Sequence, residues 1–336
     1  MYARFCDEEN IYNAYLKARN GRRYKDEILR FSYNIEKNLQ NIVYELRNNK
    51  YKHGLYYEFV VNDSKKRIIR AAPFKDRIIH HALCNIIEPI FEKSFIFDSY
   101  ACRLGKGLHK AIKRFKQFLR IIKLKNNLKD YNNIYVLKCD IVQYFNSVNK
   151  NILFELIKRK IKDENILAII LIILNSYEKG LPIGNLTSQL FANIYLDNLD
   201  KFIKHQLRAK YYLRYMDDFL ILGHDKKLLH LSMIRIERFL AKYLQLELNH
   251  KRAGIFPTRL GVDFLGLINF YYYRLIRKSS VKRFCQKIKY FQRNKILPYY
   301  INKKCQSWLS YSRFSSSWYL RRSLENKLSI NFNELF

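Results

Sequence analysis

The sequence predicts an α+β fold, in which an antiparallel sheet is accompanied by helices. Residues 214–222 form two short apolar runs around a tight turn, and residues 134–139 form a further apolar strand. Strands joined by a tight turn pair antiparallel. Residues 7–50 and 76–95 instead carry apolar positions at helical spacing, as do segments beyond residue 280. The sheet and the helices are therefore both expected.

The N-terminal region is predicted to be helical and to end in a basic hairpin. Residues 56–61 and 67–71 read as strands, and residues 62–66 between them as a turn. Lys65 and Arg70 are the best choices for phosphate contacts, because ammonium and guanidinium groups both suit phosphate oxygens. A solvated basic hairpin is the alternative.

The next helix, at residues 76–95, carries a crowded apolar face. His80 and His81 lie in it without a partner at metal-ligand spacing, so we interpret them as packing or RNA-contact residues. Residues 105–118 follow as a glycine turn and a basic helix, which suits a nucleic-acid backbone.

Two adjacent carboxylates, Asp217 and Asp218, occupy the turn of the 214–222 hairpin. Neighbouring residues of a strand point to opposite faces, so only a turn lets both acids serve one site. Like charges side by side repel unless a cation lies between them, and Mg²⁺ fits that description. A solvated surface turn is the alternative, but it does not require the apolar flanks seen here.

A third carboxylate, Asp140, ends the apolar strand at residues 134–139. With Asp217 and Asp218 it would supply acidic ligands for two Mg²⁺ ions, which can activate a hydroxyl and stabilise a leaving pyrophosphate during in-line phosphoryl transfer. Alone, Asp140 would be an ordinary strand-end residue.

The composition favours a polyanionic partner. The chain carries 63 Lys and Arg against 29 Asp and Glu, a formal charge of +34, and nucleic acid is the natural counter-charge. No signal peptide or lipid anchor is visible, and the apolar run at residues 166–174 is too short to span a bilayer, so no membrane partner is expected. The six cysteines are far apart without a Cys-x-x-Cys pair, as is typical of reduced thiols in a cytoplasmic protein.

Residues 270–336 form a strongly basic C-terminal region, with 15 Lys and Arg against two Glu. Helical spacing at residues 281–291 and 308–328 predicts a small helical body that grips a duplex backbone. Trp308 and Trp318 are interpreted as core residues.

These motifs resemble those of reverse transcriptases. The matching segments are the signature turn at residues 215–218, the segment 180–189 beside the incoming nucleotide, the Phe-Leu-Gly block at 261–266, and the finger motifs at 70–77 and 99–107. The resemblance implies a right-hand polymerase. Its expected parts are fingers at 1–133, a palm at 134–268 with 148–186 partly in the fingers, and a helical thumb at 269–336.

The resemblance also assigns site residues. It implies catalysis by Asp140, Asp217 and Asp218, and two Mg²⁺ ions, with Mn²⁺ as a substitute, held by these acids and Ile141. Phe145 is the expected steric gate against a 2′-hydroxyl, with Tyr144 or a plain core aromatic as alternatives. The remaining expected nucleotide-binding residues are Lys65, Arg70, Ile183, Gly184 and Gln189. Lys251 resembles the lysine proposed to protonate pyrophosphate.

The form Ile183-Gly184 followed by Ser188-Gln189 resembles reverse transcriptases of diversity-generating retroelements, which are bacterial or phage-encoded. Many relatives carry glutamine where Ile183 stands, so the resemblance implies the loss of a polar check on nucleotide placement; a neutral packing choice at Ile183 is the alternative. This resemblance implies copying of a template RNA into cDNA with errors at adenines. The implied partners are the template RNA, the RNA–cDNA duplex, dNTPs and a small basic accessory protein, the accessory variability determinant. A defence-associated or retron-type enzyme, or a non-catalytic RNA-binding scaffold, are the alternatives.

Overall fold

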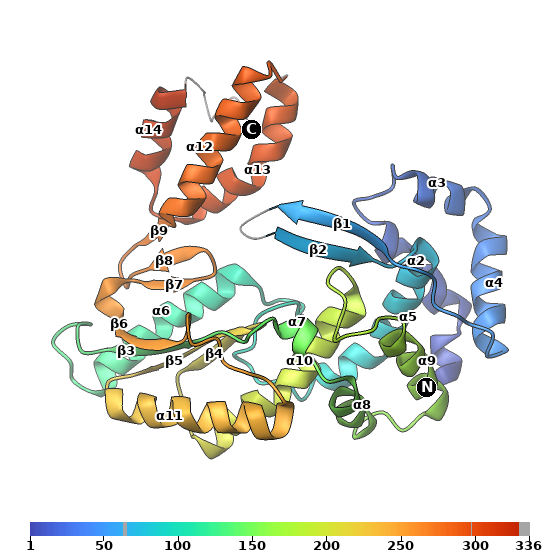
Figure 1. Ribbon diagram of the computed structural model, residues 1–336, viewed down its shortest axis with the longest axis horizontal. Coiled ribbons are helices and arrows are strands. Elements are labelled where there is room, and N and C mark those ends of the chain that lie inside the picture. The colour runs from blue at the N-terminus through green and yellow to red at the C-terminus, as the bar shows by residue number, and fades with distance from the viewer. Residues whose placement is uncertain (63–65, 297, 329–336) are drawn as a thin grey trace. The chain divides into compact units, whose positions relative to one another are not determined.

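A computed structural model describes residues 1–62, 66–296 and 298–328 (Figure 1). The chain divides into two compact units. Unit 1 comprises Met1–Gly107, Lys138–Phe219 and Leu231–Ala253, and unit 2 comprises Leu108–Leu137, Leu220–His230 and Gly254–Phe336. These units do not follow the three expected sequence ranges, so the division into fingers, palm and thumb stays a prediction.

Unit 1 is mainly helical and contains a two-stranded sheet. Its elements are α1 (Tyr2–Phe5), α2 (Glu8–Arg19), α3 (Asp26–Tyr33), α4 (Ile35–Arg47), β1 (Tyr57–Asn62), β2 (Lys66–Ala71), α5 (Phe74–Glu92), α7 (Tyr144–Ser147), α8 (Lys150–Lys158), α9 (Glu164–Asn175), α10 (Leu186–Lys201), the π-helical turns η1 (Phe202–Gln206) and η2 (Leu240–Leu244), and β4 (Tyr212–Tyr215). Helix α5 packs against α2 and α10. Residues on all sides of α10 are buried, which makes it the central helix of this unit.

Three elements start in one unit and end in the other: β3 (Tyr135–Cys139), β5 (Asp218–Gly223) and α11 (Lys226–Phe239). Unit 2 adds α6 (Leu108–Lys125), β6 (Gly254–Pro257), the 3-10 turn η3 (Thr258–Leu260), β7 (Val262–Phe264), β8 (Leu267–Asn269), β9 (Arg274–Ile276), α12 (Lys278–Arg293), α13 (Pro298–Phe314) and α14 (Trp318–Leu328).

The chain forms three sheets in its described residues. Strands β1 and β2 pair antiparallel, with Glu58 opposite Arg70. The four-stranded sheet has the order β4-β5-β3-β6, and β7-β8-β9 is an antiparallel meander. Leu265 and Gly266, both at positive φ (52° and 83°), form the two-residue turn between β7 and β8. That backbone matches the twist of a tight hairpin, and glycine adopts it without strain.

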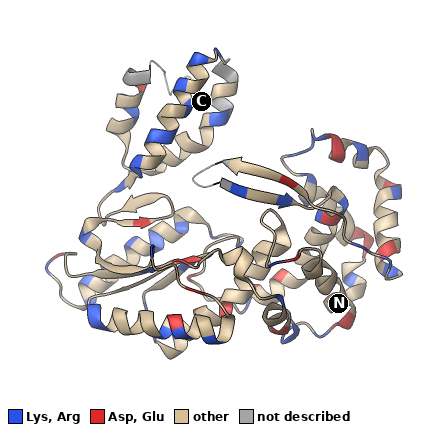
Figure 2. Ribbon diagram, in the orientation of Figure 1, with Lys and Arg blue, Asp and Glu red and all other residues tan. Residues whose placement is uncertain are grey.

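The core of unit 2 lies among its C-terminal helices. Phe284, Ile288 and Phe291 of α12 pack with Leu309 of α13 and other buried residues. The ring of Trp308 stacks on Phe284 at 3.8 Å, so Trp308 is a core residue as predicted. The prediction for Trp318 is wrong, since 52% of that residue is exposed. Lys and Arg residues lie along α12 and α13 (Figure 2).

The helices and strands predicted from the sequence are confirmed apart from one detail, and the predicted turn at residues 62–66 lies partly outside the described residues. The predicted helix at 308–328 is broken at Ser315–Ser317, between α13 and α14. Lys65 lies outside the described residues. No helix in the described ranges has both the length and the apolar character required to cross a bilayer.

Candidate catalytic site

The two-residue turn between β4 and β5 carries Asp217, and Asp218 begins β5. Met216 takes a left-handed conformation with φ of 56°, which is uncommon for a side chain of this size. The carbonyl oxygen of Met216 accepts a hydrogen bond of 3.1 Å from Nη1 of Arg214. The guanidinium of Arg214 therefore helps to hold the bend on which both acids depend.

Arg214 is itself fixed by a buried ion pair. Its Nε and Nη2 donate to the two carboxylate oxygens of Asp200 at 2.7 and 2.6 Å, and both side chains are fully buried. Asp200 also accepts from the hydroxyl of Tyr212 at 2.6 Å, and Arg214 Nη1 reaches Asn193 Oδ1 at 3.2 Å. This fork geometry satisfies the buried charges and ties the turn to α10.

Asp140 follows β3 directly and is nearly buried. Its Oδ2 accepts hydrogen bonds from Nδ2 of Asn249 at 3.0 Å and from Nη1 of Arg252 at 3.3 Å. The backbone N–H of Asn249 also donates to the Asp140 carbonyl at 2.8 Å. Ile141 pairs with Leu248 in an isolated antiparallel bridge, so the segment after η2 lies alongside the end of β3.

The end of β3 and the start of β5 lie side by side. Nζ of Lys138 is 3.7 Å from Oδ2 of Asp218. Burial first, and then the charges of Asp218 and Asp140, raise the pKa of the Cys139 thiol, so both acids lie near that residue. Burial also raises the pKa of Tyr144, and the charge of Asp217 adds to it. The structure therefore brings the three predicted acids into one neighbourhood.

The donor set in this neighbourhood suits a hard divalent cation, because carboxylate oxygens are the ligands such ions prefer. Within the described ranges, however, no three Asp, Glu, His or Cys side chains are gathered closely enough to hold a metal ion. Lys138 lies beside Asp218 and Arg252 beside Asp140 instead. A cation bound by these acids would have to compete with both basic side chains.

The expected gate region starts with a second left-handed residue, Gln143, at φ of 43°. It turns the chain from β3 into α7, where Tyr144 is buried and donates from its hydroxyl to the Ala192 carbonyl at 2.5 Å. Phe145 is half-buried, and its carbonyl accepts from Leu181 N–H at 2.7 Å. Of the two aromatic rings, Phe145 is the one with solvent access.

The segment 180–189 lies against the hairpin of β1 and β2. The backbone N–H of Arg70 donates to the Ile183 carbonyl at 2.8 Å, and Gly184 approaches the Arg70 backbone closely. The guanidinium of Arg70 bonds Glu58 at 2.5 Å and lies over the ring of Tyr177 at 4.8 Å. Gln189 is half-buried in the first turns of α10. Arg70, Ile183 and Gly184 are thus neighbours.

The sequence did not identify Arg252 or Asn249 as site residues. Lys251, chosen instead, is exposed, and Arg252 is the residue that contacts Asp140. Asn249 could have been noticed as a polar residue placed directly after the alternating segment at residues 244–248, whose last residue, Leu248, pairs with Ile141.

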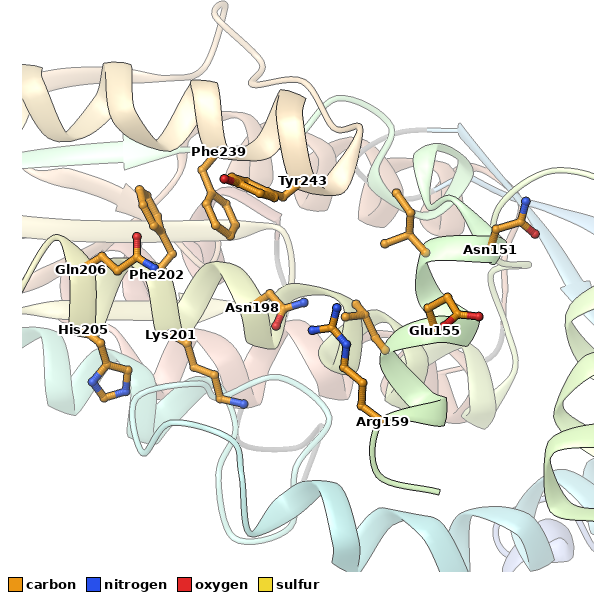
Figure 3. Close-up of a pocket in the computed structure, with 12 residues that line it drawn as sticks. Asn151, Glu155, Arg159, Asn198, Lys201, Phe202, His205, Gln206, Phe239 and Tyr243 are labelled. Atoms are coloured by element: carbon orange, nitrogen blue, oxygen red, sulfur yellow. The ribbon is translucent and has the colours of Figure 1, made fainter. Parts of the chain in front are cut away.

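Unit 1 also holds an open cavity of about 620 Å³ that none of the three acids lines. Its walls come from α8, from α10 with η1, and from α11 with η2 (Figure 3). The rings of Phe202 and Phe239 stack there at 4.2 Å. This cavity is separate from the acid neighbourhood and does not supply phosphoryl-transfer groups to it.

The fold is that of a right-hand polymerase. A solved structure of apo telomerase from Candida tropicalis superimposes with a TM-score of 0.55 at 13% identity, covering 76% of this chain and 57% of that one. A second telomerase structure from the same organism, with a TWJ fragment of telomeric RNA, gives a TM-score of 0.51 at 13% identity, covering 83% and 56%. At this identity the likeness shows the fold alone.

Residues 52–269 match the family model described as reverse transcriptase (RNA-dependent DNA polymerase). The chain belongs to this family. It is 24% identical to Protein YkfC of Escherichia coli over 262 residues, covering 65% of each chain. It is 30% identical over 179 residues to the group II intron-encoded protein LtrA of Lactococcus lactis, covering 48% of this chain and 28% of LtrA. The chain therefore spans less than two thirds of the length of these relatives.

Proposed function

We propose that this chain is an RNA-directed DNA polymerase of the diversity-generating retroelement type, with Asp140, Asp217 and Asp218 as its catalytic acids. One observation supports the first part: in a chain of the reverse transcriptase family, Asp218 begins β5 and lies 3.7 Å from Lys138 of the neighbouring strand β3, and Asp140 directly follows β3. The reaction joins a primer 3′-hydroxyl to the α-phosphorus of a dNTP and releases pyrophosphate.

In this proposal the three carboxylates and the carbonyl of Ile141 would hold two Mg²⁺ ions, or Mn²⁺ in their place. Such ions supply an activated hydroxyl and neutralise charge on the phosphates. The chain itself orients the acids, through Arg214 for the turn and through Asn249 for Asp140. Lys251 remains the proposed proton donor to pyrophosphate, and Arg252 provides a positive charge at Asp140.

The proposed nucleotide contacts come from two neighbouring segments. Arg70 can turn from the exposed Glu58 to a triphosphate, because an exposed ion pair is weak. Lys65 would contribute a second charge. Phe145 would stack under the sugar, and Ile183, Gly184 and Gln189 would contact the nucleotide and the template.

A primer-extension assay tests the polymerase assignment. It compares the wild type with Asp217→Asn and Asp218→Asn on an RNA template with a DNA primer, dNTPs and Mg²⁺. Each variant removes a charge at nearly constant volume and is expected to lower extension by at least about 100-fold, the order of loss for transition-state electrostatics. Asp7→Asn, at an exposed helix start, is the matched control and should extend like the wild type.

Binding of the RNA–DNA hybrid and thermal unfolding are measured in parallel. Lost synthesis with retained binding and folding supports the assignment. A wild type that extends no primer, with either metal and with or without a basic accessory protein, favours the RNA-binding scaffold.

The error-prone subtype is proposed from Ile183, whose aliphatic side chain offers no hydrogen bond beside the incoming nucleotide. Sequencing of cDNA made from an adenine-rich RNA tests it. Misincorporation is expected to concentrate opposite adenine and to fall in Ile183→Gln, while Ile183→Leu should retain it. Accurate copying of adenines by the wild type, with and without the accessory protein, would remove this subtype and leave the polymerase.

A further inference from the structure

A tyrosine-rich turn joins β8 to β9 in unit 2. Residues 270–273 form a four-residue loop closed by a 3.0 Å hydrogen bond from Phe270 N–H to the Tyr273 carbonyl. Tyr271 and Tyr272 lie at its tip, and 75% of Tyr272 is exposed. The loop therefore presents large aromatic rings to solvent.

These rings belong to a larger group that includes a distant tyrosine. Tyr131 stacks on Tyr271 with ring centres 3.6 Å apart and planes 20° apart. Tyr272 stands edge-on to both, at 4.7 Å from Tyr271 and 5.9 Å from Tyr131. We refer to Tyr131, Tyr271 and Tyr272 as the tyrosine cluster.

Basic side chains of α6 border the tyrosine cluster. Nζ of Lys116 is 5.4 Å from the centre of the Tyr271 ring, and Nζ of Lys123 is 4.9 Å from that of Tyr131. Arg120 lies between them at helical spacing, so all three point along one face. Helix α6 contains seven Lys and Arg and no acidic residue, so it is a strongly basic helix.

The backbone under the cluster is held firmly. The carbonyl of Tyr131 accepts from the hydroxyl of the buried Thr258 at 3.2 Å. The amide of Asn269 donates to the carbonyls of Val262, Phe264 and Leu267, which locks the strands beneath the loop. The rings are thus positioned before any ligand arrives, which lowers the entropic cost of binding.

We propose that the tyrosine cluster and the adjoining face of α6 form a binding surface for single-stranded nucleic acid outside the polymerase site. The exposed ring of Tyr272 can stack on an unpaired base, and the lysines can neutralise the phosphates of the same strand. A duplex does not offer this contact, because its bases are already stacked on one another. The identity of the strand, template RNA or DNA product, rests on the proposed function; the stacking surface does not.

Fluorescence anisotropy with three labelled probes tests the proposal: a 15-nucleotide single-stranded RNA, the DNA of the same sequence and a blunt RNA–DNA hybrid. Tyr272→Ala is expected to weaken binding of a single strand on the order of 10-fold. Tyr272→Phe keeps the ring and should bind within about twofold of the wild type. Tyr33→Ala, at a residue 87% exposed in unit 1, is the matched control and should change nothing.

The charge contribution is measured separately with the double variant Lys116→Gln/Lys123→Gln. Log affinity falls as log salt concentration rises, and the magnitude of this slope should be smaller in the variant by about 1.4. Each phosphate contact with a single strand contributes about 0.7 to it. If Tyr272→Ala weakens binding of the single-stranded RNA, the template is the occupant. If it weakens binding of the single-stranded DNA alone, the occupant is the DNA product. The proposal is overturned if Tyr272→Ala leaves both single strands unaffected, or weakens the blunt hybrid equally. Primer extension on an RNA–DNA hybrid with a one-nucleotide template overhang tests the proposed function separately. This substrate has no long single strand that could bind the tyrosine cluster. Failure to extend it therefore counts against the polymerase assignment and not against the binding surface.

Discussion

The buried pair of Arg214 and Asp200 supports a quantitative prediction about the turn that carries the acids. Replacing Arg214 by Met leaves the fully buried Asp200 carboxylate without its cation. Breaking a buried pair in this way costs about 3–5 kcal/mol, because the remaining charge is still desolvated. The variant also loses the hydrogen bond to the Met216 carbonyl, so the bend before Asp217 loses its brace.

Thermal unfolding followed by circular dichroism measures this cost. A loss of 3–5 kcal/mol corresponds to a midpoint lowered by roughly 6–20 °C for a body of this size. Arg277→Met is the matched control, because Arg277 pairs with Asp263 on the surface and both are partly exposed. An exposed pair contributes about 0–1 kcal/mol, so the control should shift the midpoint by at most about 4 °C.

The double variant Arg214→Met/Asp200→Leu separates the pair from simple packing. Since replacing both buried charges by apolar groups removes the desolvation penalty, this variant should be more stable than Arg214→Met alone. If Arg214→Met unfolds within about 2 °C of the wild type, or if the second substitution makes the protein still less stable, then Arg214 does not stabilise the buried Asp200 carboxylate.

Three further outcomes are expected. Gly180→Ala should lower the free energy of unfolding by about 1–3 kcal/mol. Gly180 has a φ of 66°, and an added Cβ would lie 2.3 Å from the carbonyl oxygen of Phe145. Thermal unfolding measures this loss, and an unchanged midpoint would contradict it. Burial lowers the pKa of His80 to about 3, so the unfolded chain binds a proton there below about pH 6.5 and the folded chain does not. Stability should therefore fall with pH from about 6.5 towards 3, by up to about 1.4 kcal/mol per unit for this residue. Denaturant titrations at pH 7.5 and 5.0 should show a smaller loss in His80→Gln, and an equal loss would refute it. Arg252→Gln removes the cation 3.3 Å from Asp140 and should tighten Mn²⁺ binding about two- to fivefold, as measured by electron paramagnetic resonance without nucleic acid; unchanged affinity would count against the competition inferred here.

Much of the fold could be predicted because its signals are local. Apolar residues around a turn predicted the hairpin of β4 and β5, and helical spacing predicted α5 and α12. The break between α13 and α14 also had a local signal, since the serines from Ser315 to Ser317 compete for backbone hydrogen bonds. The hydroxyls of Ser315 and Ser317 both donate to the Ser312 carbonyl.

The support of the site could not be predicted, because it joins residues far apart in the chain. Nothing in the sequence around Arg214 identifies Asp200 as its partner, and both could equally have been surface charges. Whether Lys251 or Arg252 contacts Asp140 depends on the path of the chain after Leu248, which pairs with Ile141.

The basic residues beside the acids reduce the repulsion between the carboxylates, as a bound divalent cation would. Three carboxylates in one neighbourhood repel one another, and their partial burial strengthens that repulsion. Lys138 beside Asp218 and Arg252 beside Asp140 supply compensating charge from within the chain. The acids can therefore come together as the protein folds, before any ion is bound. The measured metal affinity is therefore a difference between two free energies: that of the acids with the ion, and that of the acids with these basic side chains. Substitutions at Lys138 and Arg252 should change the metal affinity without changing the fold.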